Sequence, residues 1–309
     1  SNMLTISYPA GTFSSTGNIP VTVTVTDADA SFLVEKQLVG VLALFATFDF
    51  KVNGTSKGNL TLTASGGIPD REFGDVAHNF LYLPVTNPTT GKTWLNHNLG
   101  AHYTQVNHPD FDPTYEITDL NDHLAFGSLF QGGRYSDGHE LITWTGPDNA
   151  TPVNSGATNA KLPSTNRDSN AFIYSCNMSS CYPYSWMDPI NFDTWNGVAA
   201  ANNPCPDGYR LPTEEEYTNE VASWSSKDVS GVLASTLKLT TVGSRDGSSS
   251  ATPIFPNDVG RYPTSEYRGY TVDDEYRTAL LFFNPSTGFT SISTDNTRTG
   301  YPVRCIKDE

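Results

Sequence analysis

The sequence predicts a mainly β protein in which a small N-terminal β-sandwich precedes a larger α+β domain with long irregular loops. Three observations support this fold class. Aliphatic residues alternate with threonine near the N-terminus, only one helix has a clear start, and the rest is rich in aromatic residues and turns. We place the domain boundary after residue 72, so the predicted domains are residues 1–72 and 73–309. A chain of 309 residues is long enough for a substantial core.

The N-terminal residues have the patterns of strands. Residues 21–26 and 60–64 alternate aliphatic side chains with threonine, which is typical of half-buried strands. The nearly continuous apolar run Leu38–Phe50 suits a strand buried on both faces, or two adjoining strands. The Asn-Gly pair at 53–54 favours a hairpin turn, and Gly66–Asp70 indicates a break. Strands and turns over about 65 residues suit a small sandwich of immunoglobulin type.

One helix has a well-defined start. Thr213 and Glu216 form a capping box, in which each side chain bonds the other residue's backbone N–H. Tyr217, Val221 and Trp224 follow at helical spacing and give the predicted helix one apolar stripe.

Other elements are predicted from shorter patterns. His123–Gln131 carries a weaker helical pattern. Near the C-terminus, Ala279–Phe283 and Phe289–Ser293 flank the turn residues 284–288 and predict a hairpin. Tyr301–Ile306 is predicted to close the chain as a final strand.

The charge balance excludes two classes of partner. The chain has 33 Asp and Glu against 18 Lys and Arg, a formal net charge of −15. Nucleic acids and anionic membrane surfaces are bound by basic patches, so we expect neither partner. No apolar run reaches the roughly 18 residues of a membrane-spanning helix, and we expect none.

The four cysteines are Cys176, Cys181, Cys205 and Cys305. Three disulfide pairings are available, and free structural thiols or a zinc site are the alternatives. The spacing of Cys176 and Cys181 differs from a zinc knuckle, and no histidine lies near the other two. The residues therefore favour disulfides, which indicate an oxidising compartment.

No catalytic residue is predicted. The sequence has no Gly-x-Ser-x-Gly elbow, and its histidines lie in the first half of the chain, so a nucleophile-histidine set would need long-range assembly. Paired carboxylates for glycosidase chemistry are available in any acidic protein, and solvated acidic loops account for them equally well.

A calcium ion is the one cofactor that the sequence suggests. Asp110, Asp112, Asp119 and Asp122 lie in one irregular stretch, and a second acidic group lies at 273–275. Calcium prefers carboxylate and carbonyl oxygens supplied by such loops. Solvated acidic loops are the alternative interpretation.

Aromatic residues are the main candidates for ligand binding. They are accompanied by the polar residues Asp137, His139 and Arg261. The alternative is that these rings form the core of a domain with little regular structure. The candidate rings are Tyr135, Trp144, Tyr182, Tyr184, Trp186, Tyr262, Tyr267 and Tyr270.

Several segments resemble one family. Thr93–Ala101 reads T-W-L-N-H-N-L-G-A and resembles a W-L-D-R-N-L-G-A motif. Gly127–Arg134 resembles G-x-L-Y-Q-W-G-R, and Asn203–Tyr217 closely resembles N-P-C-P-x-G-W-R-L-P-T-x-x-E-W. With the segments at 243–247, 260–265 and 303–308, these occur in the order found in the Fibrobacter succinogenes major paralogous domain. The resemblance covers about residues 76–309.

The resemblance implies a C-type lectin-like fold, shared with the formylglycine-generating, sulfatase-modifying enzymes. It also implies an exported surface protein of Bacteroidetes or Fibrobacteres, with an immunoglobulin-like or fimbrillin-like module in front. It implies a disulfide between Cys205 and Cys305, which leaves Cys176 with Cys181. Those enzymes use a reactive cysteine pair shortly before the closing motif, and residues 284–302 contain no cysteine. The enzymatic activity is therefore not expected.

The predicted function is a non-enzymatic adhesion or ligand-binding protein, either a fimbrial tip protein or a surface lipoprotein. Its expected location is the cell surface, with an outer-membrane anchor as one form. Expected partners are a host or bacterial surface protein, a glycan, or other pilus subunits. One alternative is a carbohydrate-binding component of a glycan-capture system, and a second is an enzyme on the same scaffold.

Overall fold

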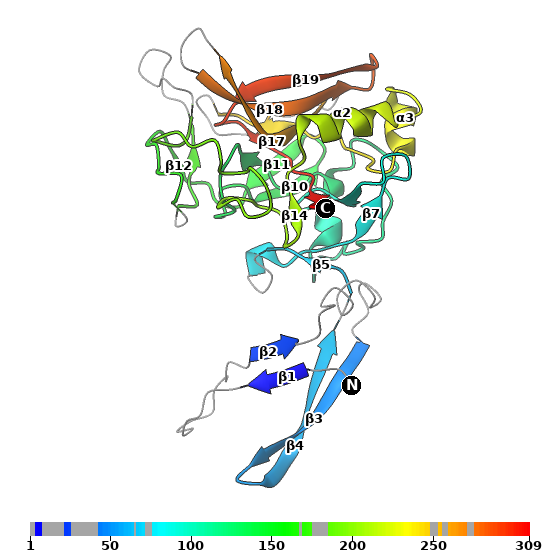
Figure 1. Ribbon diagram of the computed structural model, residues 1–309, viewed down its shortest axis with the longest axis vertical. Coiled ribbons are helices and arrows are strands. Elements are labelled where there is room, and N and C mark those ends of the chain that lie inside the picture. Colours follow the sequence, from blue (N-terminus) through cyan, green and yellow to red (C-terminus); the bar gives the residue numbers. More distant parts are fainter. Residues whose placement is uncertain are drawn as a thin grey trace. The chain divides into compact units, whose positions relative to one another are not determined.

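The computed structural model describes residues 4–7, 22–25, 43–64, 66–71, 76–166, 169–174, 185–247, 253–254, 259–270 and 275–309. The chain divides into two compact units, Ser1–Gly67 and Ile68–Glu309. The predicted mainly β character is confirmed, with several small sheets and few helices (Figure 1). The predicted domain boundary after residue 72 stays a prediction. Among the described residues, no helix has the length and apolar character needed to cross a membrane.

In its described residues, the first unit has two pairs of antiparallel strands. Strand β1 (Leu4–Ser7) pairs with β2 (Thr22–Val25), and β3 (Ala43–Val52) pairs with β4 (Thr55–Ala64). The hairpin predicted at Asn53 and Gly54 is confirmed, because both residues have positive φ angles, 50° and 77°, as a two-residue hairpin turn requires. Residues 38–42 of the predicted apolar strand lie outside the described residues.

The described part of the second unit includes two four-stranded sheets of very short strands. The first has the order β14-β21-β8-β7, formed by Tyr209–Arg210, Ile306–Lys307, Thr93–Leu95 and Pro84–Thr86. The second has the order β16-β15-β20-β9, formed by Pro253–Ile254, Ser244–Arg245, Gly300–Tyr301 and Phe130–Gln131.

Smaller elements connect these sheets. Three strand pairs are β5 with β6 (Ile68–Pro69, Leu81–Tyr82), β10 with β11 (Ile142–Gly146, Asn149–Pro152) and the parallel pair β12 with β13 (Ala157–Thr158, Phe172–Ile173). Three single helical turns are η1 (Val76–His78), η2 (His102–Thr104) and η3 (His123–Ala125).

A longer three-stranded sheet lies near the C-terminus. It consists of β17 (Gly260–Tyr270), β18 (Glu275–Asn284) and β19 (Phe289–Asn296), and β18 and β19 form the predicted hairpin, which is confirmed. Helix α2 (Glu214–Ala222) packs against this sheet (Figure 1). Tyr217 and Val221 of α2 contribute to a core cluster with apolar side chains of the sheet.

The predicted capping box of α2 is confirmed. The Glu216 backbone N–H donates to Thr213 Oγ1 at 3.1 Å, and the Thr213 N–H donates to Glu216 Oε2 at 2.8 Å. The helix ends at Ala222, so Trp224 lies beyond it, yet the ring remains buried. A second helix, α3 (Val229–Ala234), was not predicted.

Two predicted elements are wrong. The helical pattern at 123–131 forms only the single turn η3, because Gly127 adopts a φ of 78° and lies directly against the Leu99 carbonyl. The final strand predicted over 301–306 is two short strands, β20 and β21. Between them the chain places Arg304 and Cys305 in the core instead of continuing a ladder.

The disulfide between Cys205 and Cys305 is confirmed, and it joins residues 100 positions apart. Both cysteines are fully buried in a core cluster with side chains such as Leu95 and Val303. Cys176 and Cys181 lie outside the described residues. The loop before α2 is thereby fixed to the last strands of the chain.

Candidate functional site

Three of the predicted ligand-binding rings lie in the core. Trp144 and Trp186 are 3% and 1% exposed, and their indole N–H groups donate to the carbonyls of Gly127 and Gly132 at 2.7 Å. Tyr262 is 0% exposed. For these three rings the burial fits the alternative interpretation, in which the aromatic residues form the core. They pack in the core, and their N–H or O–H groups make hydrogen bonds inside the protein.

Not all of the remaining predicted candidates lie within the described residues. Tyr135 is half-buried in the loop after β9. Arg261 is half-buried on β17, and its guanidinium lies 5.5 Å from the centroid of a phenylalanine ring of β18. Tyr182 and Tyr184 lie outside the described residues.

The four aspartates predicted to bind calcium do not come together. Asp110 pairs with a nearby histidine at 3.6 Å. Asp112 and Asp119 each accept a backbone N–H from two residues ahead, and Asp122 caps η3 in the same way. In the part of the chain that the structure describes, they form no group able to hold a metal ion. Each carboxylate makes local contacts instead, and the calcium site stays a prediction.

Asp137 and His139 belong to a buried ionic cluster that also contains His78, Arg134 and Glu140. Arg134 donates to Asp137 Oδ2 through Nε and Nη2, at 3.1 and 2.9 Å. His139 Nδ1 lies 2.6 Å from Asp137 Oδ1 and 3.1 Å from Glu140 Oε2. These side chains are at most 8% exposed. The cluster pairs its charges internally, as burial requires.

The backbone assigns the proton on His139. The Gln131 N–H donates to His139 Nε2 at 3.1 Å, so the proton of the neutral ring lies on Nδ1, which donates to Asp137. Asp137, His139 and Glu140 are the one group within the described residues whose ligand atoms lie within 4.8 Å of one another. In this arrangement both ring nitrogens of His139 are engaged in hydrogen bonds within the protein.

Glu140 connects the cluster to Ser136. Its Oε1 accepts from Ser136 Oγ at 2.5 Å and lies 3.0 Å from His78 Nε2. Burial raises the pKa of Glu140, but hydrogen bonds from His139 and His78 outweigh it and hold the pKa well below its usual value. Ser136 Oγ also lies 3.0 Å from His78 Nε2. One ring nitrogen thus faces both hydroxyl and carboxylate, whereas a catalytic triad places them on opposite nitrogens.

A second group of histidines lies where η2 meets η3. His102 stacks on His108 with ring centroids 4.5 Å apart. Burial, followed by the proximity of His108 and His123, lowers the pKa of His102 from 6.5 to about 4. His102 is therefore neutral in the folded protein under conditions where the unfolded chain binds a proton.

We expect the free energy of unfolding to decrease as the pH falls from 6.5 to about 4, the window between the unfolded and folded pKa values of His102. The contribution of this residue is on the order of 2 kcal/mol, since the ring is partly screened by solvent. Urea denaturation at pH 7.5 and 4.5 measures it, with His102→Gln losing less stability than the wild-type protein. An equal loss in both proteins would contradict the assignment.

A surface groove of about 410 Å³ lies between the loop after Ile190 and strand β17. We call it the Phe192 groove. The half-buried rings of Phe192 and Tyr267 lie 5.7 Å apart at 58° to each other. The groove is lined by Phe192, Asp193, Asn196, Ser265, Glu266, Tyr267 and Gly269.

The position of Tyr267 depends on a glycine. Its hydroxyl lies 3.1 Å from Thr194 Oγ1 and directly over Gly133, where a Cβ atom would collide with both hydroxyls. Gly133 also adopts a φ of 77°, which disfavours any other residue. The tyrosine is thus held by its polar end, while its ring borders the groove.

Comparisons with protein-family models, curated proteins and solved structures find no match for this chain.

Tyr267 was predicted as a candidate from the sequence, whereas Phe192, Arg134 and Glu140 were not. Phe192 follows a turn-rich segment and has polar neighbours, which was the available signal for a ring near the surface. The burial of Arg134 and Glu140 was not predicted, because Arg and Glu are rarely buried unless paired. Most of their partners lie within four positions, such as Asp137 for Arg134 and His139 for Glu140, whereas His78 is distant.

Proposed function

We propose that this chain is a non-enzymatic, exported surface protein that binds its ligand in the Phe192 groove and acts in adhesion. The groove carries the proposal because it joins two half-buried rings to exposed carboxylates. Asp193 and Glu266 are both exposed, and no Lys or Arg lines the described part of the groove. Rings and directed polar groups in one concavity are the usual composition of a binding site.

The surroundings of the groove are held rigidly. Thr194 is buried, and Trp195 donates its indole N–H to the Arg134 carbonyl at 3.1 Å. Asn202 binds the carbonyls of Gly133 and Ser164 at 2.8 and 2.9 Å. Loops fixed in this way lose little conformational entropy when a ligand binds.

The disulfide supports the proposed location. A buried bond between Cys205 and Cys305 is typical of exported proteins, because the cytosol keeps thiols reduced. The resemblance to the Fibrobacter succinogenes major paralogous domain supports the same location. We propose on that basis a C-type lectin-like fold for the second unit and a β-sandwich for the first, with an anchor on the outer membrane or a place at a fimbrial tip.

Carbohydrate is the second candidate for the ligand. The tilted pair Phe192 and Tyr267 offers aromatic surface to the C–H face of a sugar ring. The Asn196 amide and the carboxylates of Asp193 and Glu266 can bind its hydroxyl groups. This combination supports a role in glycan capture as the second candidate.

Replacing Phe192 by alanine tests the groove directly. We expect binding to a glycan array, or to intact bacterial or host cells, to weaken at least about 10-fold, or about 1.4 kcal/mol, because the ring is the largest apolar contact. The matched control is Phe289→Ala, which removes a ring that is 55% exposed on β19.

The two assays separate the candidates. Array signals that disappear in Phe192→Ala and persist in Phe289→Ala support glycan binding. A silent array, with cell binding that depends on Phe192, supports a protein ligand. Binding that is unchanged in Phe192→Ala overturns the assignment of the groove.

A further inference from the structure

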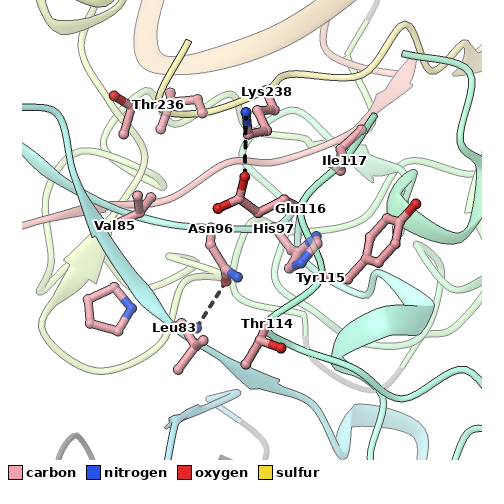
Figure 2. A pocket seen from close by; sticks show the side chains of 12 residues that line it. Leu83, Val85, Asn96, His97, Thr114, Tyr115, Glu116, Ile117, Thr236 and Lys238 are labelled. Carbon is pink, nitrogen blue, oxygen red and sulfur yellow. Dashed lines mark hydrogen bonds and ion pairs between the residues drawn. The ribbon is translucent and has the colours of Figure 1, made fainter. Parts of the chain in front are cut away.

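A second pocket, of about 210 Å³, lies elsewhere on the second unit (Figure 2). It is formed by β7 with the preceding Leu83, by Asn96 and His97 after β8, and by the segments 114–117 and 236–238. At about 30 Å³ per water molecule, it holds roughly seven waters or one molecule the size of a sugar ring.

His97 is the unusual residue of this pocket. Its side chain is buried, with the residue 1% exposed, and neither ring nitrogen makes a hydrogen bond. The neighbouring Asn96 is fully engaged, accepting the Leu83 N–H at 3.0 Å and donating to the Pro113 carbonyl at 2.7 Å. A buried polar atom without a partner costs about 1–3 kcal/mol. Folding alone gives no reason to place an imidazole here.

The His97 ring is uncharged. Burial, and then the positive charge of Arg304, lower its pKa to about 3. The Tyr115 backbone and Asp112 act weakly in the opposite direction, and the Tyr115 backbone lies outside the geometry of a hydrogen bond. A neutral imidazole offers one donor and one acceptor.

The remaining lining also disfavours a charged ligand. Glu116 and Lys238 form an ion pair at the rim, 3.8 Å apart, so their charges largely cancel (Figure 2). Leu83, Val85 and Ile117 contribute apolar surface. An ion inside would lose its hydration without gaining a partner of opposite charge.

The backbone at the rim is strained. Lys238 has a φ of 45°, in the left-handed region that non-glycine residues rarely adopt. Its Nζ donates to the Leu233 carbonyl at 2.6 Å, and its N–H donates to Ser235 Oγ at 3.1 Å, so local bonds maintain this conformation. Such strain is concentrated at ligand sites.

We propose that this pocket binds one small, uncharged, hydroxyl-rich molecule of about the size of a sugar ring. His97 donates one hydrogen bond to a ligand hydroxyl and accepts another. The Leu83, Val85 and Ile117 side chains cover its C–H surface. Because the ring nitrogens are not exposed, the side chains around His97 must rearrange as the ligand binds. This site is separate from the Phe192 groove and does not depend on it.

The test is NMR titration of the full chain with uncharged hexoses, each compared with its uronic acid and its amino sugar. We expect at least one hexose to shift the ¹⁵N resonances of His97. The matching charged sugars should bind at least about 10-fold more weakly, equivalent to about 1.4 kcal/mol. The variants His97→Phe and His97→Gln should weaken binding by a similar factor.

Tyr267→Phe and Phe192→Ala serve as controls, because they alter only the groove. If binding is lost in these variants and retained in His97→Phe, the hexose occupies the groove and the proposal is overturned. It is equally overturned if no hexose shifts the His97 resonances, which would mean that the pocket holds water only. Because the ¹⁵N shifts are measured on the unaltered protein, a variant that fails to fold leaves this test intact.

Discussion

Replacing Arg304 by methionine is expected to unfold the second unit. The Arg304 guanidinium is fully buried and donates to Asn98 Oδ1 and to the carbonyls of Leu95, Asn96 and Leu237. Methionine fills much of the same volume but leaves these acceptors without donors. At about 1–3 kcal/mol for each orphaned group, the loss is on the order of 5 kcal/mol or more. That equals much of the total stability of a typical domain.

Thermal and urea denaturation, together with the yield of soluble protein, measure this effect. Arg304→Lys should also be strongly destabilised, because one ammonium group cannot reach acceptors that surround a planar guanidinium. The matched control is Arg268→Met, whose side chain is 52% exposed and pairs with Glu214. That change should cost no more than about 1 kcal/mol. A stable Arg304→Met protein would show that the buried bonds are dispensable.

Removing the Cys205–Cys305 disulfide is expected to have the second largest effect. The bond closes a loop of 100 residues. In the chain-entropy model such a loop is worth up to about 4.7 kcal/mol, before any strain is subtracted. The double variant Cys205→Ala with Cys305→Ala should therefore unfold at much lower urea concentration than the wild-type protein. Both sulfurs are buried, so the native bond should resist reduction until the protein unfolds.

Intact mass and peptide mapping without reductant check the bond itself, and denaturation with and without reductant checks its contribution. The control is Ser286→Ala, in the exposed turn between β18 and β19, which should leave stability unchanged. Free thiols at Cys205 and Cys305 in the oxidised protein would contradict the structure. A double variant as stable as the wild-type protein would contradict the entropic argument.

Much of the local structure could be predicted because its causes are local. The hairpin at Asn53 and Gly54 follows from the backbone angles that those residues tolerate. The start of α2 follows from Thr213 and Glu216, which are close enough in sequence to bond each other's backbone.

The candidate sites were only partly predicted, because burial is decided by distant residues. The residues next to Trp144, Trp186 and Tyr262 in the sequence resemble those next to exposed aromatic residues, yet all three side chains are buried in the fold. Asp137 and His139 were identified as ligand residues and are instead bonded to Arg134 and Gln131. The local sequence does not distinguish a charged side chain that will be buried in an ion pair from one that will be exposed to solvent.

The sequence alone determined the mainly β class, the capped helix and the C-terminal hairpin, each from contacts between residues a few positions apart. Only the tertiary structure decided that Arg304 lies in the core, that Phe192 meets Tyr267, and that His97 borders a pocket without a hydrogen-bond partner. These features depend on segments that lie far apart in the chain, such as Phe192 with Tyr267 and Leu237 with Arg304, the latter pair 67 positions apart. Packing over such separations is set by the whole core, and it determines where a ligand can bind.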